Sequence, residues 1–286
     1  MTRRIRTVAV AAPSGPAEPG ALARGLAVLR ELGCEVELIP PGEPEGFLAA
    51  PDGRRAARFL EAVSRGADLL MAARGGYGAA RLMALLPPAS PAGPGILMGF
   101  SDVTALLVSL CPRWGWGAVH GPNVTTLQRL DRASLEALAA FLEYPDRGLE
   151  FRGLEPLAPG RGRGLVLAGN LSVLCSLMGT SLEPDLAGRI LVIEDTGEAP
   201  YRLDRLLRQL AGSKGFPALA GLAAGDLGEG AQDDAVRRTL VEICTAAGVP
   251  AASGLPVGHG ASNRPLRLSA NAFLDAAAGT LVTGLP

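Results

Sequence analysis

The chain of 286 residues is poor in the residue types on which several common chemistries depend. It has one lysine, Lys214, and two histidines, His120 and His259. Lys214 stands in the sequence AGSKG, which fits neither the phosphate-binding loop G-x-x-x-x-G-K-[ST] nor the S-x-x-K motif of penicillin-binding enzymes. If an imidazole takes part in catalysis, it therefore belongs to His120 or His259.

Cysteines are few and widely spaced. None of the four has a partner in a C-x-x-C motif: Cys34, Cys111, Cys175 and Cys244. This spacing argues against a zinc ribbon, a redox-active dithiol and a disulfide scaffold. We expect four thiols in the core, no metal site and no cofactor.

Strong charge and long apolar runs are also missing. The net charge is −1 and no basic run extends beyond Arg3-Arg4, so the sequence predicts no binding to nucleic acid or to an anionic membrane. No apolar run approaches the ~20 residues of a membrane helix, and the run at 8–12 is shorter than the ~7–15 residues of a signal-peptide core. We expect a cytoplasmic globular protein whose partners are small molecules or a second copy of itself.

Short β-rich runs alternate with helical patterns through the first half of the chain, which predicts repeated βα units. The expected fold class is α/β, with a doubly wound parallel sheet in an N-terminal domain, residues 1–146. A smaller mixed α/β domain is expected at residues 165–286. The segment 147–164 between them is rich in Gly, Pro and Arg and is interpreted as a linker.

The sequence GFSD, residues 99–102, stands between an apolar run ending at Phe100 and a helical pattern from Val103 to Leu110. Serine and aspartate are preferred helix caps, so Ser101 is explained by capping alone. A strand-to-helix turn is also where a hydrolase exposes a nucleophilic serine, although G-x-S-x-G is broken at Val103. Both interpretations stay open on this stretch.

Three further stretches carry candidate residues. The sequence ARGGYGAARL, residues 73–82, is either a tight turn or a loop that stabilises an oxyanion with backbone N–H groups. Glu194 and Asp195 end an apolar strand and are either solvated turn residues or functional carboxylates. His259 lies between two glycines, which favours a functional role over a packing role, whereas His120 is expected to be a buried residue at a strand end.

Together these stretches resemble the LD-carboxypeptidases, a serine peptidase family that includes the microcin C immunity-type hydrolases. The order of the motifs carries the resemblance: RGGYGAARL, GFSDVTALL, GPN at 121–123, GNLSVL at 169–174, LVIEDTGEAPYRLDRLLRQL and GLPVGH. The resemblance extends from APSGP at 12–16 to the region of His259 and so covers most of the chain.

The resemblance implies a catalytic triad of Ser101, Glu194 and His259, with the N–H groups of Gly76 and Asp102 as the oxyanion hole. In such a triad the histidine takes the proton of the serine, and the carboxylate orients the imidazole and stabilises its charged form. Asp102 would then serve the start of its helix as well as catalysis. Because the serine belongs to the first half of the chain and its partners to the second, we expect the site between the domains.

The resemblance also implies the substrate, a murein tetrapeptide from which the terminal D-Ala is released, and a homodimer. The free carboxylate of such a substrate needs a cation or N–H donors, for which Arg74 is a candidate. Tyr77 in RGGYG and Asn170 in GNLSVL are further candidates for substrate binding.

Two other functions stay open. The same triad could cleave a peptidyl-nucleotide or aminoacyl-nucleotide conjugate, as in the microcin C immunity branch. An adenine ring would need an aromatic side chain on which to stack, and only 4% of the residues are aromatic. A non-catalytic ligand-binding protein on the same fold is less favoured, because all three triad positions are filled.

Overall fold

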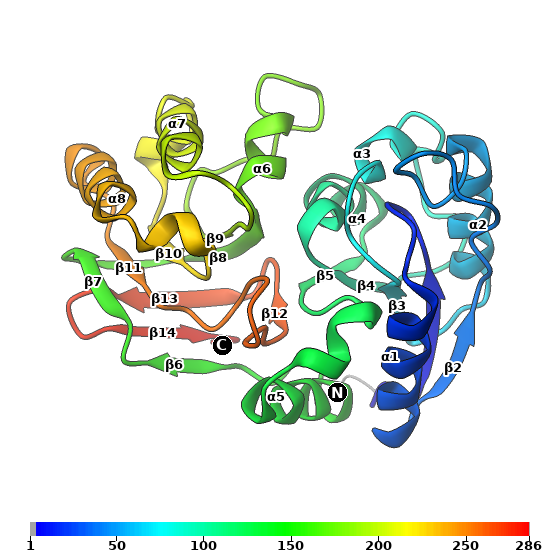
Figure 1. Cartoon of the computed structure of the whole chain (residues 1–286). Helices are drawn as coiled ribbons and strands as arrows, with labels where there is room; N and C mark the ends of the chain where they lie inside the picture. The colour runs from blue at the N-terminus through cyan, green and yellow to red at the C-terminus, as the bar shows by residue number, and fades with distance from the viewer. Residues whose placement is uncertain (1–3, 286) are drawn as a thin grey trace. The chain divides into compact units, whose positions relative to one another are not determined.

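The computed structural model describes residues 4–285, and the chain divides into two compact units that meet in sequence between Asp146 and Arg147. Both units combine a β-sheet with helices, as the expected α/β class requires (Figure 1). Within the described residues no helix has both the length and the apolar character needed to cross a bilayer. All four cysteines are buried and outside any disulfide, as expected.

The first unit is built on a parallel sheet. Its strands pair in the order β5-β4-β3-β1-β2, and each pairing is parallel. The strands are β1 (Thr7–Ala11), β2 (Glu35–Leu38), β3 (Leu69–Ala72), β4 (Ile96–Gly99) and β5 (Gly117–His120). The helical segments between and after them are α1 (Pro19–Glu31), α2 (Asp52–Ser64), α3 (Ala79–Leu82), α4 (Cys111–Trp114), α5 (Arg132–Glu143) and the shorter turns η1 (Ser101–Val103), η2 (Leu106–Leu110) and η3 (Val124–Arg129).

Alternation along the strands gives this sheet two apolar faces. Val8 and Val10 of β1 pack in one cluster with Leu29 of α1 and Leu138 of α5. The residues between them, such as Ala9, point to the opposite face, because successive side chains of a strand alternate. Helix α2 contacts β1, and Figure 1 shows α1 and α2 on either side of that strand. The sheet is therefore doubly wound, as predicted.

The helix predicted from Val103 to Leu110 is not one regular α-helix. It begins as the 3₁₀ turn η1 and passes into the π-helical turn η2, which is followed directly by α4. Pro112 in the first turn of α4 lacks the N–H that would continue the α-helical ladder. The apolar spacing that predicted the helix still holds, because Leu106, Leu107 and Leu110 are buried.

The second unit contains a mixed sheet in the order β6-β14-β13-β8-β9-β10-β11-β7. Neighbours from β8 to β11 are parallel, and the outer pairings are antiparallel. The strands are β6 (Glu150–Arg152), β7 (Glu155–Ala158), β8 (Arg161–Asn170), β9 (Arg189–Glu194), β10 (Gly221–Ala224), β11 (Ala251–Ser253), β13 (Asn271–Asp275) and β14 (Thr280–Thr283); β12 (Leu266–Arg267) is a two-residue strand.

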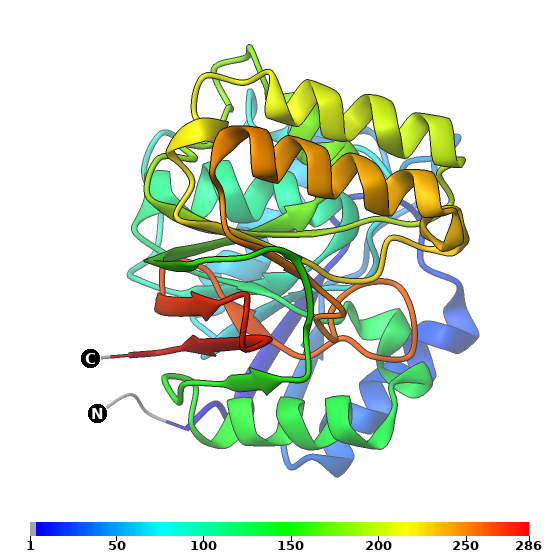
Figure 2. The same cartoon turned by 90° about the vertical axis from the view of Figure 1, so that its left-hand side faces the viewer.

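Helices cover this sheet on one face. They are α6 (Leu171–Leu177), α7 (Pro200–Ala211) and α8 (Asp234–Ala247), together with the short turns η4 (Phe216–Ala218) and η5 (Glu229–Gln232). Figures 1 and 2 both show α7 and α8 side by side over the strands. Leu203, Leu207 and Leu210 form the buried stripe of α7, at the spacing of one helix face.

The interpretation of residues 147–164 as a linker is wrong. These residues form β6, β7 and the first part of β8, all within the second unit's sheet. The glycines that suggested flexibility allow close packing instead. A Cβ on Gly162 would lie 1.7 Å from the carbonyl oxygen of Ala220, and one on Gly164 would lie 2.1 Å from that of Gly188.

Candidate active site

Ser101 lies in a strained turn at the end of β4. Its φ is +62°, and Ser269 is the other non-glycine residue with a positive φ in the described part of the chain. A β-carbon makes this conformation costly, and such strain persists only where the surroundings impose it. A serine held this way between a strand and a helical turn has the backbone geometry of a nucleophile elbow.

The capping interpretation of Ser101 is wrong. Phe100 occupies the cap position of η1 and makes no side-chain cap hydrogen bond, and Ser101 is the first residue of the turn itself. The Ser101 side chain lies against Gly75 instead. A Cβ on Gly75 would be 2.8 Å from Cβ of Ser101 and 2.9 Å from its Oγ. Only a glycine at position 75 leaves this space free for the hydroxyl.

The glycine-rich loop between β3 and α3, residues 73–78, is called the glycine loop below, and contacts on both sides fix it. Gly76 and Gly78 have φ of +112° and +115°, which L side chains rarely adopt. Gly75 accepts a hydrogen bond from the N–H of Gly15 at 3.0 Å, and Gly78 accepts one from Nη1 of Arg55 at 2.9 Å. No sequence pattern indicated Arg55, a fully buried arginine that reaches the loop from α2.

Asp102 connects the serine turn to the glycine loop. Its Oδ2 accepts a hydrogen bond from the N–H of Ala79 at 2.8 Å, and the side chain is buried. Asp102 lies in the first turn of its own helical segment η1, as expected, and its carboxylate in addition bonds the first residue of α3. This contact ties the loop that carries Gly76 to the turn that carries Ser101.

Glu194 and His259 form a close pair in the second unit. Glu194 ends β9 and is fully buried, and its Oε2 lies 2.7 Å from Nδ1 of His259, whose side chain is 22% exposed. With Nδ1 at the carboxylate, Nε2 is the ring nitrogen that would exchange a proton with a substrate or nucleophile. A carboxylate in contact with one nitrogen of a histidine makes up the basic half of a triad.

The loop that carries His259 is held by Asp226, which follows β10. Its Oδ2 accepts from the N–H of Gly260 at 2.9 Å and its Oδ1 from the N–H of Gly228 at 2.8 Å. Gly258, before the histidine, has a φ of +136°, and a Cβ there would lie 2.7 Å from Cβ of Asp226. The glycines around His259 therefore permit a close approach to Asp226.

Burial and the short contact between Glu194 and His259 have opposite effects on the pKa values of both side chains. Burial raises the pKa of Glu194, while the hydrogen bond and charge of His259 lower it. Burial lowers the pKa of His259, but the hydrogen bond and charge of Glu194, together with the charges of Asp195 and Asp226, outweigh it, so the pKa of His259 lies above its ordinary value of 6.5. The carboxylate thus strengthens the imidazole as a base.

Comparison with known sequences decides the family. The sequence model of the LD-carboxypeptidase N-terminal domain matches residues 8–121, and that of the LD-carboxypeptidase C-terminal domain matches residues 163–274. The chain belongs to the LD-carboxypeptidase family. A Synechocystis relative whose name describes a carboxypeptidase is 36% identical over 289 residues, covering 95% of this chain and 92% of the relative.

Solved structures agree with this family. The muramoyltetrapeptide carboxypeptidase of Oxalobacter formigenes superposes with a TM-score of 0.85 at 27% identity, covering 97% of each chain. The microcin C7 self-immunity protein MccF superposes with a TM-score of 0.86 at 20% identity, covering 100% of this chain and 97% of that chain. The likeness to MccF is one of fold alone.

In this LD-carboxypeptidase family member, two candidates for substrate binding lie on the glycine loop. Tyr77 is 52% exposed, and its ring meets that of Phe47 edge to face at a centroid distance of 5.2 Å. Arg74 is exposed and donates from Nη1 to the carbonyl oxygen of Pro16 at 2.6 Å. Their roles toward a substrate stay predictions.

Asn170 and Asp195 share a hydrogen-bond network beside Glu194. The side chain of Asn170 is buried, caps α6 by accepting from the N–H of Val173 at 3.1 Å, and donates to Asp195 at 3.2 Å. Oδ2 of Asp195 accepts from the N–H and the hydroxyl of Ser172. Both side chains thus serve the start of α6, and substrate binding by Asn170 stays a prediction.

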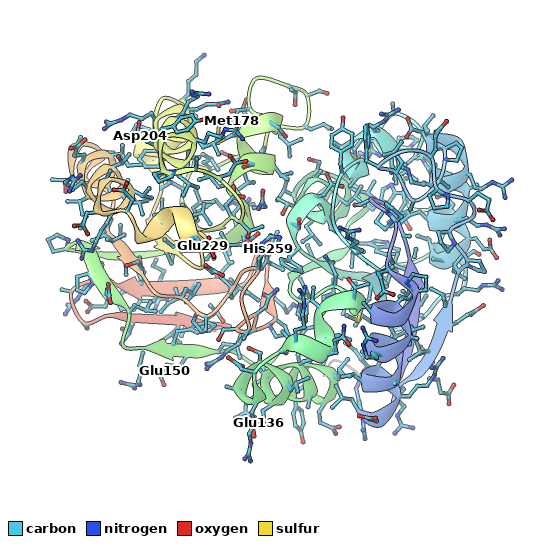
Figure 3. All side chains as sticks on the ribbon, in the orientation of Figure 1. Glu136, Glu150, Met178, Asp204, Glu229 and His259 are labelled. Atoms are coloured by element: carbon cyan, nitrogen blue, oxygen red, sulfur yellow. The ribbon has the colours of Figure 1, made fainter. Side chains whose placement is uncertain are left out.

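A cavity of about 660 Å³ opens beside His259 in the second unit. His259, Glu229, Glu198 and Asp226 contribute to its lining, and Figure 3 labels the first two. Glu198 pairs with Arg202 at 3.7 Å. The three carboxylates give the wall next to the imidazole a negative character, which favours a cationic group on a ligand.

Two further observations bear on the sequence expectations. His120 is fully buried at the end of β5, where its ring meets that of Phe100 at a centroid distance of 6.0 Å. This is the strand-end position expected for it. Across residues 4–285, His, Cys, Asp and Glu side chains form no group of three or more that could hold a metal ion.

Proposed function

We propose that this protein is a serine hydrolase that releases the terminal D-Ala from murein tetrapeptide, with Ser101 as nucleophile, His259 as base and Glu194 as the orienting carboxylate. The observation that carries the proposal is the 2.7 Å contact between buried Glu194 and Nδ1 of His259. The positive φ of Ser101 supports its part independently. Family membership supports a peptidase reaction.

In the proposed reaction, Oγ of Ser101 attacks the carbonyl carbon between diaminopimelate and D-Ala while Nε2 of His259 takes the hydroxyl proton. The imidazolium gives that proton to the departing amine, which leaves D-Ala and an acyl-enzyme ester. Water then attacks the ester with His259 again as base, releasing the tripeptide and restoring Ser101. Glu194 stabilises the imidazolium in both steps.

The N–H groups of Gly76 and Asp102 are proposed to bind the oxyanion that forms in each step. Backbone donors are effective here when they are fixed before the reaction, since no energy is then spent on orienting them. The glycine loop and the serine turn meet this requirement through the bond from Ala79 to Asp102 and the bond from Arg55 to Gly78.

The substrate class is supported by a solved relative and by charge. The Oxalobacter formigenes relative is named a muramoyltetrapeptide carboxypeptidase. Diaminopimelate carries an ammonium group, and the negative wall of the cavity beside His259 suits a cation. Arg74, Tyr77 and Asn170 are proposed as further contacts to the peptide, with Arg74 facing its terminal carboxylate.

Mass spectrometry tests the substrate directly. Purified protein incubated with murein tetrapeptide should yield the tripeptide and free D-Ala, and a peptidyl-nucleotide in a parallel reaction should stay intact. Cleavage of the nucleotide conjugate alone would favour the microcin immunity activity, which the structural likeness to MccF keeps as the second candidate. Absence of both products, with no labelling by a fluorophosphonate, would favour a non-catalytic ligand-binding protein.

Two further expectations remain part of this proposal: the homodimer that the resemblance implies and the cytoplasmic location that the sequence predicts. We propose that the protein acts as a homodimer and in the cytoplasm. Light scattering of the purified protein measures the first, and fractionation of cells that express it measures the second.

Catalysis should be lost toward acid pH with a midpoint above 6.5. His259 accepts a proton only when neutral. Burial lowers its pKa, but the hydrogen bond and charge of Glu194 and the charges of Asp195 and Asp226 raise it above 6.5. As the pH falls through that raised pKa, the imidazole becomes protonated and kcat/KM should fall with it. A profile of kcat/KM from pH 5 to 9 checks this, and a midpoint below 6.5 would contradict it.

Gly75→Ala should lower kcat by about 10²-fold, because a new Cβ would stand 2.8 Å from Cβ and 2.9 Å from Oγ of Ser101 and would displace the nucleophile. Gly93→Ala is the matched control, since a Cβ on Gly93 meets nothing within 4 Å. The measurement compares kcat of the two variants on murein tetrapeptide, with thermal melts to confirm that both are folded. Equal activity of the two variants would show that Ser101 tolerates the crowding.

A further inference from the structure

Asn123 makes a two-point contact with the residue that precedes the serine. Its Oδ1 accepts from the N–H of Phe100 at 3.3 Å, and its Nδ2 donates to the carbonyl oxygen of Phe100 at 3.4 Å. The side-chain amide therefore bonds both backbone groups of one residue, as a neighbouring strand would, and the carbonyl oxygen also accepts from the N–H of Val103 at 3.3 Å. Asn123 is 2% exposed, so these bonds are sheltered from water.

Two glycines leave the space in which this amide lies. A Cβ on Gly99 would come within 2.9 Å of Oδ1 of Asn123. A Cβ on Gly75 would come within 3.3 Å of Nδ2 of Asn123 and 2.9 Å of Oγ of Ser101. The amide and the serine hydroxyl thus border the same small space beside Gly75, which places Asn123 next to the turn.

The main chain of Asn123 is itself anchored. Its carbonyl oxygen accepts from the N–H of Thr126 at 2.9 Å and from the hydroxyl of Thr126 at 2.8 Å. Val124, the next residue, is fully buried. The amide therefore acts on Phe100 from a fixed support rather than from a loop that can follow the turn.

We propose that Asn123 is a positioning residue that holds the peptide groups of Phe100 and so keeps Ser101 at its φ of +62°. A strained residue relaxes unless its neighbours over-determine its conformation, and Phe100 is the neighbour on the N-terminal side. Relaxation of Ser101 would reorient the peptide group that joins Phe100 to Ser101 and break one or both hydrogen bonds between Phe100 and Asn123. This inference rests on the proposed function, because it takes Ser101 as the nucleophile.

Asn123→Asp tests the donor half of the contact. The variant has nearly the same shape, but as a carboxylate it offers two acceptors and repels the carbonyl oxygen of Phe100. When protonated it regains an O–H that can donate to that oxygen. At alkaline pH its kcat should lie about 10²-fold below wild type with KM unchanged, and the ratio of variant to wild-type kcat should rise as the pH falls.

Asn123→Ala separates positioning from charge. It removes both bonds without adding a charge, so its kcat should fall by about 10²-fold relative to wild type at every pH. If the aspartate variant were slow only because a carboxylate repels the oxyanion, the alanine variant would keep wild-type kcat, and that result would overturn the proposal. Should the alanine variant fail to fold, the pH series on Asn123→Asp decides: a kcat ratio independent of pH overturns it.

The rate of labelling by a fluorophosphonate distinguishes this inference from the proposed function. It reports the reactivity of Ser101 without any murein substrate and should fall in both variants. Wild type that labels at Ser101 but leaves murein tetrapeptide intact would overturn the substrate, while slower labelling of the variants would still support Asn123. Wild type that neither labels nor turns over would overturn both, and variants that label and turn over like wild type would overturn the role of Asn123 alone.

Discussion

Ser101→Ala should lower turnover of murein tetrapeptide by at least ~10³-fold, since loss of the nucleophile removes the covalent route altogether. The remaining rate would come from oxyanion binding and substrate positioning, which the substitution leaves in place. The measurement is kcat by quantifying released D-Ala, with intact-protein mass spectrometry to look for the acyl-enzyme. The variant should form no acyl-enzyme.

The fold should survive this substitution. Alanine carries the same Cβ as serine, so the strain at a φ of +62° is unchanged, and the bond from Ala79 to Asp102 involves other atoms. Thermal melts of wild type and variant should agree within a few degrees. Ser64→Ala, at the exposed end of α2 in the same unit, is the control and should keep full activity. Near-normal turnover by a folded Ser101→Ala protein would rule out Ser101 as nucleophile.

Much of the first unit could be predicted from sequence, because each βα unit has a local sequence pattern. Apolar runs end at glycine-rich turns, and parallel neighbours bring those turns to one sheet edge. The stretches ARGGYG and GFSD, which the sequence predicts as turns, lie at the ends of β3 and β4. The strained backbone at Ser101 was not predictable, since a serine with positive φ has no distinct sequence signal.

The second unit was less predictable, and the reason is the same dependence on local signals. Residues 147–164 are rich in glycine and arginine, which is typical of a linker. In the structure, glycines of β8 instead allow its backbone to approach the backbone of Ala220 and Gly188 closely. Such a requirement depends on strands distant in sequence. The identity of β6, β7 and β13 therefore needed the tertiary structure.

The residues that support the candidate site were missed for a related reason. Arg55 and Asn123 act on backbone groups 23 residues away along the chain. An arginine in an amphipathic helix is usually solvated, and an asparagine after Gly-Pro is usually a turn residue. Neither type of residue indicates a buried contact until the partner's position is known.

The pairing of Glu194 with His259 raises the question of which carboxylate serves the imidazole, because Asp195 is adjacent. Glu194→Gln should lower kcat/KM on murein tetrapeptide by about 10²–10⁴-fold. The amide keeps the shape but cannot stabilise an imidazolium, and it can favour the wrong tautomer at a nitrogen now 2.7 Å from Oε2. The acid limb of the pH profile should also move to lower pH, because the charge and hydrogen bond that raise the pKa of His259 would be weakened.

Asp195→Asn should instead lower stability while changing kcat/KM by less than about 10-fold. Its carboxylate accepts from Asn170, from the N–H of Thr196, and from both the N–H and the hydroxyl of Ser172, whereas an asparagine offers one oxygen and a donor group. At least one buried donor would lose its acceptor, which costs about 1–3 kcal/mol. Denaturant melts should show this loss as a lower free energy of unfolding.

The two variants form a matched pair, since each exchanges one carboxylate for its amide at adjacent positions. Strand β9 ends at Glu194, which reaches His259, while the next residue, Asp195, reaches Ser172 at the start of α6. The pair therefore separates orientation of the imidazole from support of the helix. If Asp195→Asn, well folded by its melt, proved the more damaging to kcat/KM, the orienting role would pass to Asp195. The contact between Glu194 and His259 would then serve the fold rather than the reaction.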